Sequence, residues 1–373
     1  MKKVFGRELE TFLALLRAGL WEEDVNLPGF DETSLPEVYR LASEQSVVGL
    51  VAAGLGHVIG MQVPAKALGP FIASILPLEK RNGDMNVFVA ELVTMLQVSG
   101  VMVMLVKGQG IAQCYDRPLW RSCGDVDLLV RASDYLRAKA VLFPKASRYK
   151  ESGSFHHLEL TMDGWVVELH GTLHTGLSWK IDQVLDTIQE DIFVGGRSRV
   201  WRNEETSVRI PAPDYDVLFV FSHILQHFFR GGIGLRQICD WCRLLWTFRD
   251  SLDVVALENR LREMQVMSEW HVFAALAVDM LGMPTEAMPL YDGSARWKRK
   301  SRRVLEFIWE VGNFGNNRDR SYYRTKPYLA RKMVSFGWRM KDLIRHFLVF
   351  PLDSVRFSFG IVRNGLLTVF RGE

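Results

Sequence analysis

Residues 101–130 read VMVMLVKGQGIAQCYDRPLWRSCGDVDLLV, and this stretch decides the fold. It opens with a continuous apolar run, Val101–Val106, which lies between Gly100 and Gly108. It closes with Asp125–Val130, whose last four residues are Asp127 and three apolar residues. Short apolar runs bounded by turn residues predict strands buried on both faces. The stretch therefore predicts two strands of one sheet, with a short helix over Ile111–Tyr115 between them.

The sequence that follows adds to the same sheet. Ser133–Leu142 has helical spacing, and Ser133 is a suitable N-cap. His156–Met162 and Trp165–Leu169 alternate apolar with polar residues around Asp163-Gly164, which predicts a β-hairpin. The order strand, helix, strand, helix, hairpin predicts one small mixed β-sheet.

Helices are expected on both sides of this core, because apolar residues recur there at helical spacing. The expected helices are Glu8–Leu20, 34–45, Val47–Leu55, Leu76–Val98, Tyr215–Arg230, Leu235–Phe248, Val254–Leu281 and Arg299–Val311. The sequence thus predicts an α+β protein in four parts: a helical N-terminal region (1–99), a sheet core (100–210), a helical domain (211–311) and a basic, aromatic helical tail (312–373).

The composition is that of a globular protein. Of 373 residues, 48% are hydrophobic and 24% are charged, which argues against disorder, collagen and coiled coil. No run of 18 clean apolar residues occurs, so no membrane-spanning helix is predicted. The N-terminus lacks the pattern of a signal peptide, so we expect a cytoplasmic protein with reduced thiols. The spacing of Cys239 and Cys242 fits helical core packing better than a metal site.

The net charge of +3 conceals a strong asymmetry. Residues 296–373 hold 18 Lys and Arg against 6 Asp and Glu, whereas residues 1–295 hold 28 against 37. The basic tail has three interpretations: a helical subdomain packed on an acidic body, an RNA-binding segment, or an interfacial helix on anionic lipid, extended by Ile361–Phe370. The first is favoured because the body is acidic.

The carboxylates Asp125 and Asp127 are the first candidates for chemistry. They alternate on a predicted strand, so both point to one face, roughly 6–7 Å apart along the chain. Glu168 lies in a later strand among apolar residues, where a buried carboxylate needs a partner. A shared cation meets both needs, and Mg²⁺ suits a few carboxylates together with substrate phosphates.

The residues between the two strands suit phosphate binding. Gly108 and Gly110 follow a buried strand and open a helix, where backbone N–H groups can hold a phosphate. Lys107 stands at the strand end and can neutralise phosphate charge. Carboxylates, cation and glycine turn together suit nucleotidyl transfer.

Gly108 followed by Asp125–Leu129 resembles the signature of the polymerase-β-type nucleotidyltransferase superfamily, with Glu168 as its later acidic residue. A narrower resemblance is to a bacterial group of uncharacterised nucleotidyltransferases, over about residues 35–245. It is carried by Leu105–Gly108, Tyr115, Arg121, Gly124–Val130, Glu168–His170, His223 and Arg236–Asp240. The turn here reads Gly108-Gln109, where the superfamily usually has Gly-Gly or Gly-Ser, and Lys107 is the expected substitute for the missing serine.

The resemblance implies a site and a substrate. Asp125, Asp127 and Glu168 are expected to be catalytic and to hold two Mg²⁺ ions. An NTP is expected to lie against Lys107, Gly108, Gln109 and Arg121. Four further side chains are expected either to hold the metal ligands in place by hydrogen bonds or to line the acceptor pocket: His170, His223, Arg236 and Asp240.

Several points stay open from the sequence. Arg121 either contacts the triphosphate or pairs structurally with Asp125, and only one of the adjacent His156 and His157 can face the site. His223 and His227 are i, i+4 on a helix and suit pocket lining or core packing better than zinc.

The predicted function is transfer of a nucleotide from an NTP to an unknown acceptor, with release of pyrophosphate. The alternatives are a non-catalytic binding module, an RNA-directed transferase that uses the basic tail, and an enzyme at an anionic membrane surface.

Overall fold

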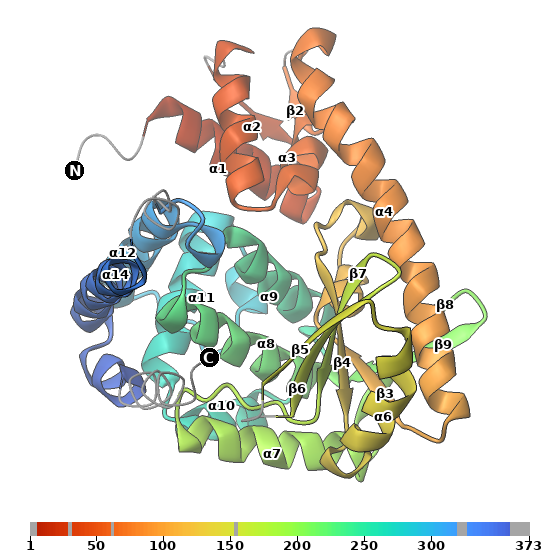
Figure 1. Cartoon of the computed structure of the whole chain (residues 1–373). Helices are drawn as coiled ribbons and strands as arrows, with labels where there is room; N and C mark the ends of the chain where they lie inside the picture. The colour runs from red at the N-terminus through yellow and green to blue at the C-terminus, as the bar shows by residue number, and fades with distance from the viewer. Residues whose placement is uncertain (1–5, 29–31, 61–62, 153–155, 319–326, 359–373) are drawn as a thin grey trace.

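The computed structural model describes residues 6–28, 32–60, 63–152, 156–318 and 327–358 (Figure 1). It has the expected α+β architecture: a small mixed sheet set among helices. The apolar segment expected at Ile361–Phe370 lies outside the described residues, as does the stretch 319–326 of the predicted tail.

The central sheet has five strands in the order β3-β4-β7-β6-β5. Their bounds are β3 Val103–Val106, β4 Asp125–Val130, β5 Arg148–Ser152, β6 His157–Met162 and β7 Trp165–His170. β4 and β7 run parallel, and the other neighbours are antiparallel. The hairpin of β6 and β7 turns at Asp163-Gly164, where both residues have positive φ, as the sequence indicated.

The two faces of the sheet belong to two different cores. Val126, Leu128 and Val130 of β4 join an apolar cluster with the helices α4 (Ala65–Val98) and α6 (Tyr135–Leu142). Leu129, one residue out of phase, joins the second and larger cluster, which is built mainly from helices. Successive side chains of β4 point to opposite faces of the sheet, so alternate residues pack into different cores. Asp125 and Asp127 therefore lie on the same face as Leu129.

The N-terminal helices form a layer that α4 connects to the sheet. Their bounds are α1 Arg7–Trp21, α2 Leu35–Glu44 and α3 Val48–Leu55. The two-residue strands β1 (Val25–Asn26) and β2 (Val58–Ile59) pair beside them. α4 is 34 residues long and passes from this layer along the sheet (Figure 1).

The second half of the chain supplies most of the larger core. Its helices are α7 Trp179–Phe193, α8 Pro213–Arg230, α9 Leu235–Phe248, α10 Val254–Met264, α11 Met267–Leu281 and α12 Ala295–Val311. Trp241 of α9 and Trp270 of α11 are fully buried. Trp270 lies edge to face on Phe221 and on Trp241, whereas Trp241 stacks on Phe221, with ring centroids 4.8–5.3 Å apart. This aromatic cluster fixes α8, α9 and α11 against one another.

Three expectations from the sequence need correction. The helix predicted over 254–281 is two helices, α10 and α11, because Gln265 has a left-handed φ of 59° that ends α10. α4 begins at Ala65 and not near Leu76, because the helix continues through the interior prolines Pro70 and Pro77, although each lacks the N–H donor of a helical hydrogen bond. The short helix after β3 is α5, Gly108–Ala112, and so begins at the glycine itself.

Other elements were not predicted at all, among them the helix α7 (Trp179–Phe193) and three strands. β5 is a polar edge strand with a single neighbour, so it needs no apolar pattern. β8 (Ser198–Asn203) and β9 (Thr206–Pro211) form a separate hairpin whose exposed strand residues are Val200, Arg202, Ser207 and Arg209.

The described part of the tail packs on the helical core. α14 (Tyr328–Val349) and the helical residues 351–358 follow α12. His346 and Phe350 are buried against Phe228 of α8, with ring centroids 4.5 and 6.0 Å away. Part of the tail's positive charge is neutralised by the preceding helix, since Lys341 and Arg345 both pair with Glu310 of α12. None of the described helices is long and apolar enough to cross a bilayer.

A buried carboxyl group joins the tail to α11. Glu269 is fully buried, and Ser268 Oγ lies 2.9 Å from its Oε2 and 3.4 Å from Asp353 Oδ2. Burial, then the charge of Asp353, raises the pKa of Glu269 well above its ordinary 4.5. The folded protein therefore favours the protonated acid.

We predict that Glu269→Gln increases stability at alkaline pH. A raised folded-state pKa gives stability that is complete below the unfolded pKa and is lost as the pH rises toward the folded pKa. The neutral amide removes that loss, so the gain over wild type should be larger at pH 8 than at pH 5 in urea unfolding. Glu263→Gln, at an exposed position on α10, is the control. Equal effects of Glu269→Gln at both pH values would contradict the assignment.

Candidate active site

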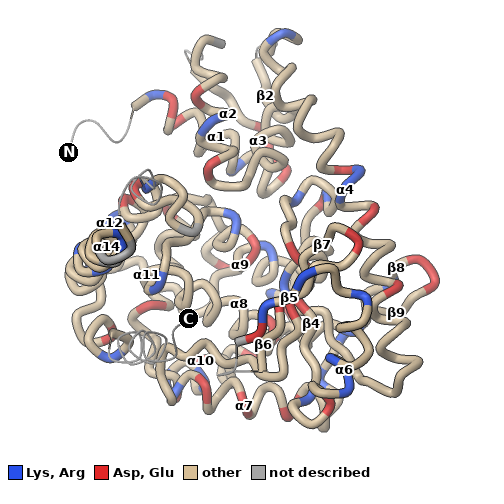
Figure 2. The backbone as a smooth tube through the Cα atoms, viewed as in Figure 1, with Lys and Arg blue, Asp and Glu red and all other residues tan. Residues whose placement is uncertain are grey.

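The carboxylates of the site are brought together by the parallel pairing of β4 and β7. In this register Asp127 lies opposite Glu168, and Asp125 lies one β-repeat away on the same face. The side chain of Asp127 is only 3% exposed, whereas that of Glu168 is 23% exposed. Figure 2 shows acidic and basic residues gathered around the strands β4 and β6.

Lys107 neutralises the buried aspartate. Its Nζ lies 2.6 Å from Asp127 Oδ1. Burial alone would lower the pKa of Lys107, but the charges of Asp127, Glu168 and Asp125 outweigh burial and raise it, so the ammonium stays charged. The lysine reaches this place from a strained backbone, with a φ of 57°. The next residue, Gly108, has a φ of 41°, a backbone conformation that favours glycine.

Two histidines enclose Glu168. The register of the hairpin places His157 of β6 opposite His170 of β7. Each Nε2 lies 3.4 Å from Glu168 Oε2, and His170 Nε2 also lies 3.0 Å from Asp127 Oδ1. Burial raises the pKa of Glu168, but the bonds from His157 and His170 and the charge of Lys107 lower it overall, so the group stays ionised.

Asp125 has a different environment. The charge of Asp127 and then burial raise its carboxyl pKa to about 6, against the lowering effect of Lys107. Two carboxylates at this spacing repel each other when no cation is close to both. The arrangement is therefore suited to accept a cation at Asp125 and Asp127.

Arg121 is a structural residue in this structure. Its guanidinium donates from Nε and Nη2 to the two carboxylate oxygens of Asp240, at 2.8 and 2.7 Å, and both side chains are 5% exposed. The hydroxyl of Tyr115 donates to the same carboxylate at 2.8 Å. This group, which we call the Arg121–Asp240 latch, ties the loop before β4 to α9.

Gln109 is also held in the interior. It is 2% exposed, and its amide nitrogen lies 3.3 Å from both the backbone and side-chain oxygens of Asn82 on α4. Asn82 in turn donates to the backbone oxygens of Leu119 and Arg121 at 2.7 and 2.8 Å. The side chain of Gln109 is thus engaged with α4 and is closed to a nucleotide.

Helices α8 and α9 complete the surroundings of the site. Arg236 donates to the backbone oxygen of Ser122 at 2.7 Å and helps to lower the pKa of Asp125. The Nε2 atoms of His223 and His227 lie 2.9 Å apart. Burial, then the charge of Lys107, lowers the pKa of His223 well below 6.5 and that of His227 to about 4, so both rings are neutral.

Sequence reasoning left one site residue undecided and missed another. Of the adjacent histidines, His157 faces Glu168, whereas the ring of His156 lies 5.0 Å from Tyr135 of α6. The signal was available, because a two-residue turn at Asp163-Gly164 fixes the register back to His157. Asn82 carried no sequence signal, since a lone asparagine within an amphipathic helix has no fixed partner.

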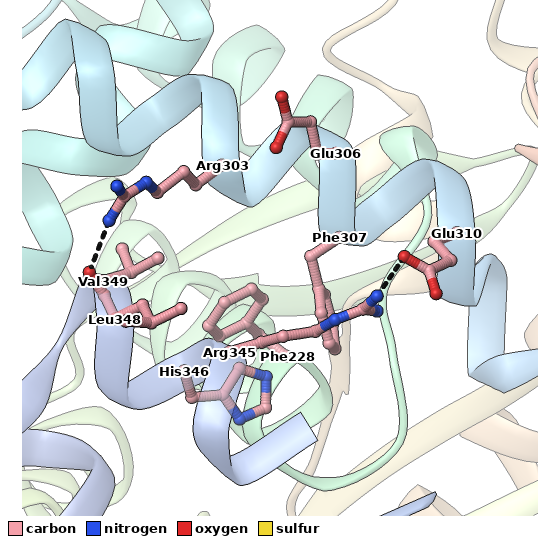
Figure 3. Close-up of a pocket in the computed structure, with 9 residues that line it drawn as sticks. All are labelled: Phe228, Arg303, Glu306, Phe307, Glu310, Arg345, His346, Leu348 and Val349. Atoms are coloured by element: carbon pink, nitrogen blue, oxygen red, sulfur yellow. Dashed lines mark hydrogen bonds and ion pairs between the residues drawn. The ribbon is translucent and has the colours of Figure 1, made fainter. Parts of the chain in front are cut away.

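A cavity of about 220 Å³ lies elsewhere, between α8, α12 and α14 (Figure 3). Its lining residues are Phe228, Arg303, Glu306, Phe307, Glu310, Arg345, His346, Leu348 and Val349. Arg345 pairs with Glu310, and Arg303 donates to the backbone oxygen of Leu348 at 3.0 Å, so both guanidinium groups have partners in the protein. The cavity shares no residue with the acidic face of the sheet.

Comparison with known proteins gives the family. The model of a family described as uncharacterised nucleotidyltransferases matches residues 31–282. The chain belongs to this family. The match spans α2 to α4, the sheet and α7 to α11. It therefore includes the carboxylates of β4 and β7, the Arg121–Asp240 latch, and the histidine pairs His157–His170 and His223–His227.

The other comparisons add little. The crystal structure of an antigenic nucleotidyltransferase-like protein from Paracoccidioides brasiliensis is similar over 53% of this chain and 92% of that chain, at 15% identity and a TM-score of 0.32. No curated protein matches the chain.

We predict that Asp240→Ala strongly destabilises the fold. It leaves the buried guanidinium of Arg121 without its carboxylate, which typically costs about 3–5 kcal/mol. Chemical denaturation measures this cost. The control is Asp84→Ala, which breaks an exposed pair with Lys80 and should cost less than about 1 kcal/mol. If the two substitutions cost the same, the latch is not a structural element.

Proposed function

We propose that the protein is a Mg²⁺-dependent nucleotidyltransferase that moves a nucleoside monophosphate from an NTP to an acceptor hydroxyl and releases pyrophosphate. The observation that carries the proposal is the β4–β7 register, which sets Asp127 beside Glu168 with Asp125 on the same face. Membership of the nucleotidyltransferase family supports it.

The residues present suit Mg²⁺. Asp125 and Asp127 offer carboxylate oxygens from a rigid strand, and the raised pKa of Asp125 reflects a repulsion that a cation would relieve. Bound there, Mg²⁺ would neutralise the triphosphate and the pyrophosphate that leaves. The aspartates orient the nucleotide by holding the cation at the end of β4.

The phosphate side of the site is formed by cations of the chain. In the proposed complex Lys107 exchanges its contact with Asp127 for the triphosphate, and Gly108 lets the backbone approach it. Arg236 supplies the second positive charge from α9, because Arg121 is committed to Asp240. The neutral pair His223 and His227 lines the acceptor side.

Glu168 is proposed as a ligand rather than as a general base. A carboxylate whose pKa is held low by two histidines and a lysine is a weak proton acceptor. Because Glu168 is already ionised, its Oε2 can bind a cation without first losing a proton. The acceptor hydroxyl is then expected to lose its proton to solvent or to the acceptor's own surroundings.

The test uses ATP, GTP, CTP and UTP labelled at the α-phosphate, with Mg²⁺ and with RNA, protein and small-metabolite fractions as acceptors. Wild type should transfer label and release pyrophosphate, and Asp125→Asn and Asp127→Asn should each lower the rate at least about 100-fold. Asp163→Asn, at the exposed turn of the hairpin, is the matched control. Nucleotide binding without pyrophosphate release would favour a non-catalytic module, and no binding at all would contradict both.

We also propose that the protein binds to an anionic membrane surface through the tail. Apolar side chains that are 41–68% exposed occupy one face of α14, opposite the buried His346; they are Met333, Phe336, Met340, Ile344 and Phe347. We call them the α14 stripe. Exposed Arg339 and Lys341 flank it on either side. An apolar stripe between cations is the pattern of a helix that lies in a lipid interface.

The expected result is co-flotation of the full chain with vesicles that contain phosphatidylglycerol, and much weaker flotation with phosphatidylcholine alone. Phe336→Ser with Ile344→Ser should abolish flotation. Leu136→Ser with Val255→Ser removes two equally exposed apolar residues elsewhere and is the control. Salt-dependent RNA binding without flotation, or self-association through the stripe, would overturn the membrane proposal.

A further inference from the structure

The acidic face of the sheet contains a second set of donor atoms with a different character. In the part of the chain that the structure describes, His157, Glu168 and His170 each place one ligand atom within 4.8 Å of the other two. They come from the neighbouring strands β6 and β7, and their side chains are partly exposed, at 31%, 23% and 19%. The set is therefore rigid and accessible from solvent.

Two of the three separations match those of ligands around one small cation, and the third, between the two histidines, is within 4.8 Å. Tetrahedral nitrogen and oxygen ligands at about 2.0–2.2 Å from Zn²⁺ stand about 3.3–3.5 Å from each other. Both histidine Nε2 atoms lie 3.4 Å from Glu168 Oε2. Asp127 Oδ1, at 3.0 Å from His170 Nε2, stands at the side of the set that faces Asp125.

The donor types decide between classes of metal. Mg²⁺ takes oxygen ligands in octahedral geometry and binds imidazole poorly, whereas Zn²⁺ and its neighbours favour imidazole with carboxylate. Two imidazoles and one carboxylate are the protein ligands of many zinc sites that keep an open position. Asp125 and Asp127 are oxygen donors only, so the two halves of this face differ in the metals they prefer.

We propose that His157, Glu168 and His170 form a site for a divalent transition metal of the zinc class, next to the magnesium-type pair Asp125 and Asp127. The inference deepens the proposed function, on which it rests for the role of the aspartates. The site thereby holds two unlike cations, and Asp127 lies between them.

The competing interpretation is structural. In it the two histidines only hold Glu168 by hydrogen bonds, and no metal binds. This interpretation predicts that the protein stripped with a chelator has no affinity for Zn²⁺ or Co²⁺ beyond that of surface histidines.

The experiment measures metal binding to the full chain without nucleotide. Isothermal titration with Zn²⁺, and the visible ligand-field absorption of Co²⁺, should both report one site per chain. His157→Ala and His170→Ala should each weaken binding at least tenfold, and millimolar Mg²⁺ should not displace Co²⁺. His174→Ala, which removes a histidine that pairs with Asp186 outside the set, is the matched control.

Two readouts keep the outcomes separate. His157 is at a partly exposed position, so its alanine variant should keep the wild-type circular dichroism, which excludes misfolding as the cause of lost binding. Asp125→Asn should keep the Co²⁺ spectrum and lose the Mg²⁺-dependent binding of NTP. Failure of the nucleotide assay alone refutes the proposed function, whereas equal Zn²⁺ affinity in wild type and both histidine variants refutes the metal site.

Discussion

The parallel pairing of β4 with β7 is the constraint on which the rest of the site depends. It places three carboxylates on the sheet face of Leu129, which packs toward the larger apolar core. Ionised groups in such a place must be compensated locally. Lys107, His157 and His170 supply the compensation, and each is positioned by a strand that is itself hydrogen-bonded to β4 or β7. The same strand pairing therefore determines both the fold of the sheet and the charge balance of the site.

Both apolar cores support the sheet face that carries the carboxylates, each in a different way. The smaller core, under α4 and α6, takes every second residue of the strands and makes the sheet rigid. The larger core brings α8 and α9 over the opposite face, where they contribute His223, His227 and Arg236. The histidine pair is neutral because it is buried beside the positive charge of Lys107. A nucleotide site at this junction would be dry on the side of α8 and charged on the side of β4.

The sequence predicted those elements whose pattern is local. β4 was expected at its observed bounds, because an apolar run bounded by polar residues has one favourable extended arrangement, and α9 was expected for its helical spacing. β5 was not expected, because an edge strand such as Arg148–Ser152 buries too little to need apolar residues. The break at Gln265 was not expected either, since a left-handed residue within a continuous helical pattern has no signature unless it is glycine or asparagine.

In the site, too, the features with a local sequence pattern could be predicted, and those that depend on contacts between distant segments could not. That Asp125 and Asp127 share a face follows from the period of a strand, and the opposition of His157 to His170 follows from the turn at Asp163-Gly164. The partner of Arg121 follows from neither, because Asp240 reaches it only through the docking of α9 on the sheet. Gln109 is a similar case: its contact with Asn82 depends on the path of α4, which no local pattern specifies.

The Arg121–Asp240 latch has a consequence for how the chain is divided and made. Its two halves are 119 residues apart, and they stand on opposite sides of the boundary near residue 210 that composition suggests. During synthesis the five strands emerge well before α9, and until then the guanidinium of Arg121 has no carboxylate to bury with. A fragment that ends before residue 240 lacks both the partner of Arg121 and the helix that covers this side chain, so we expect the sheet and the first helices after it to fold together.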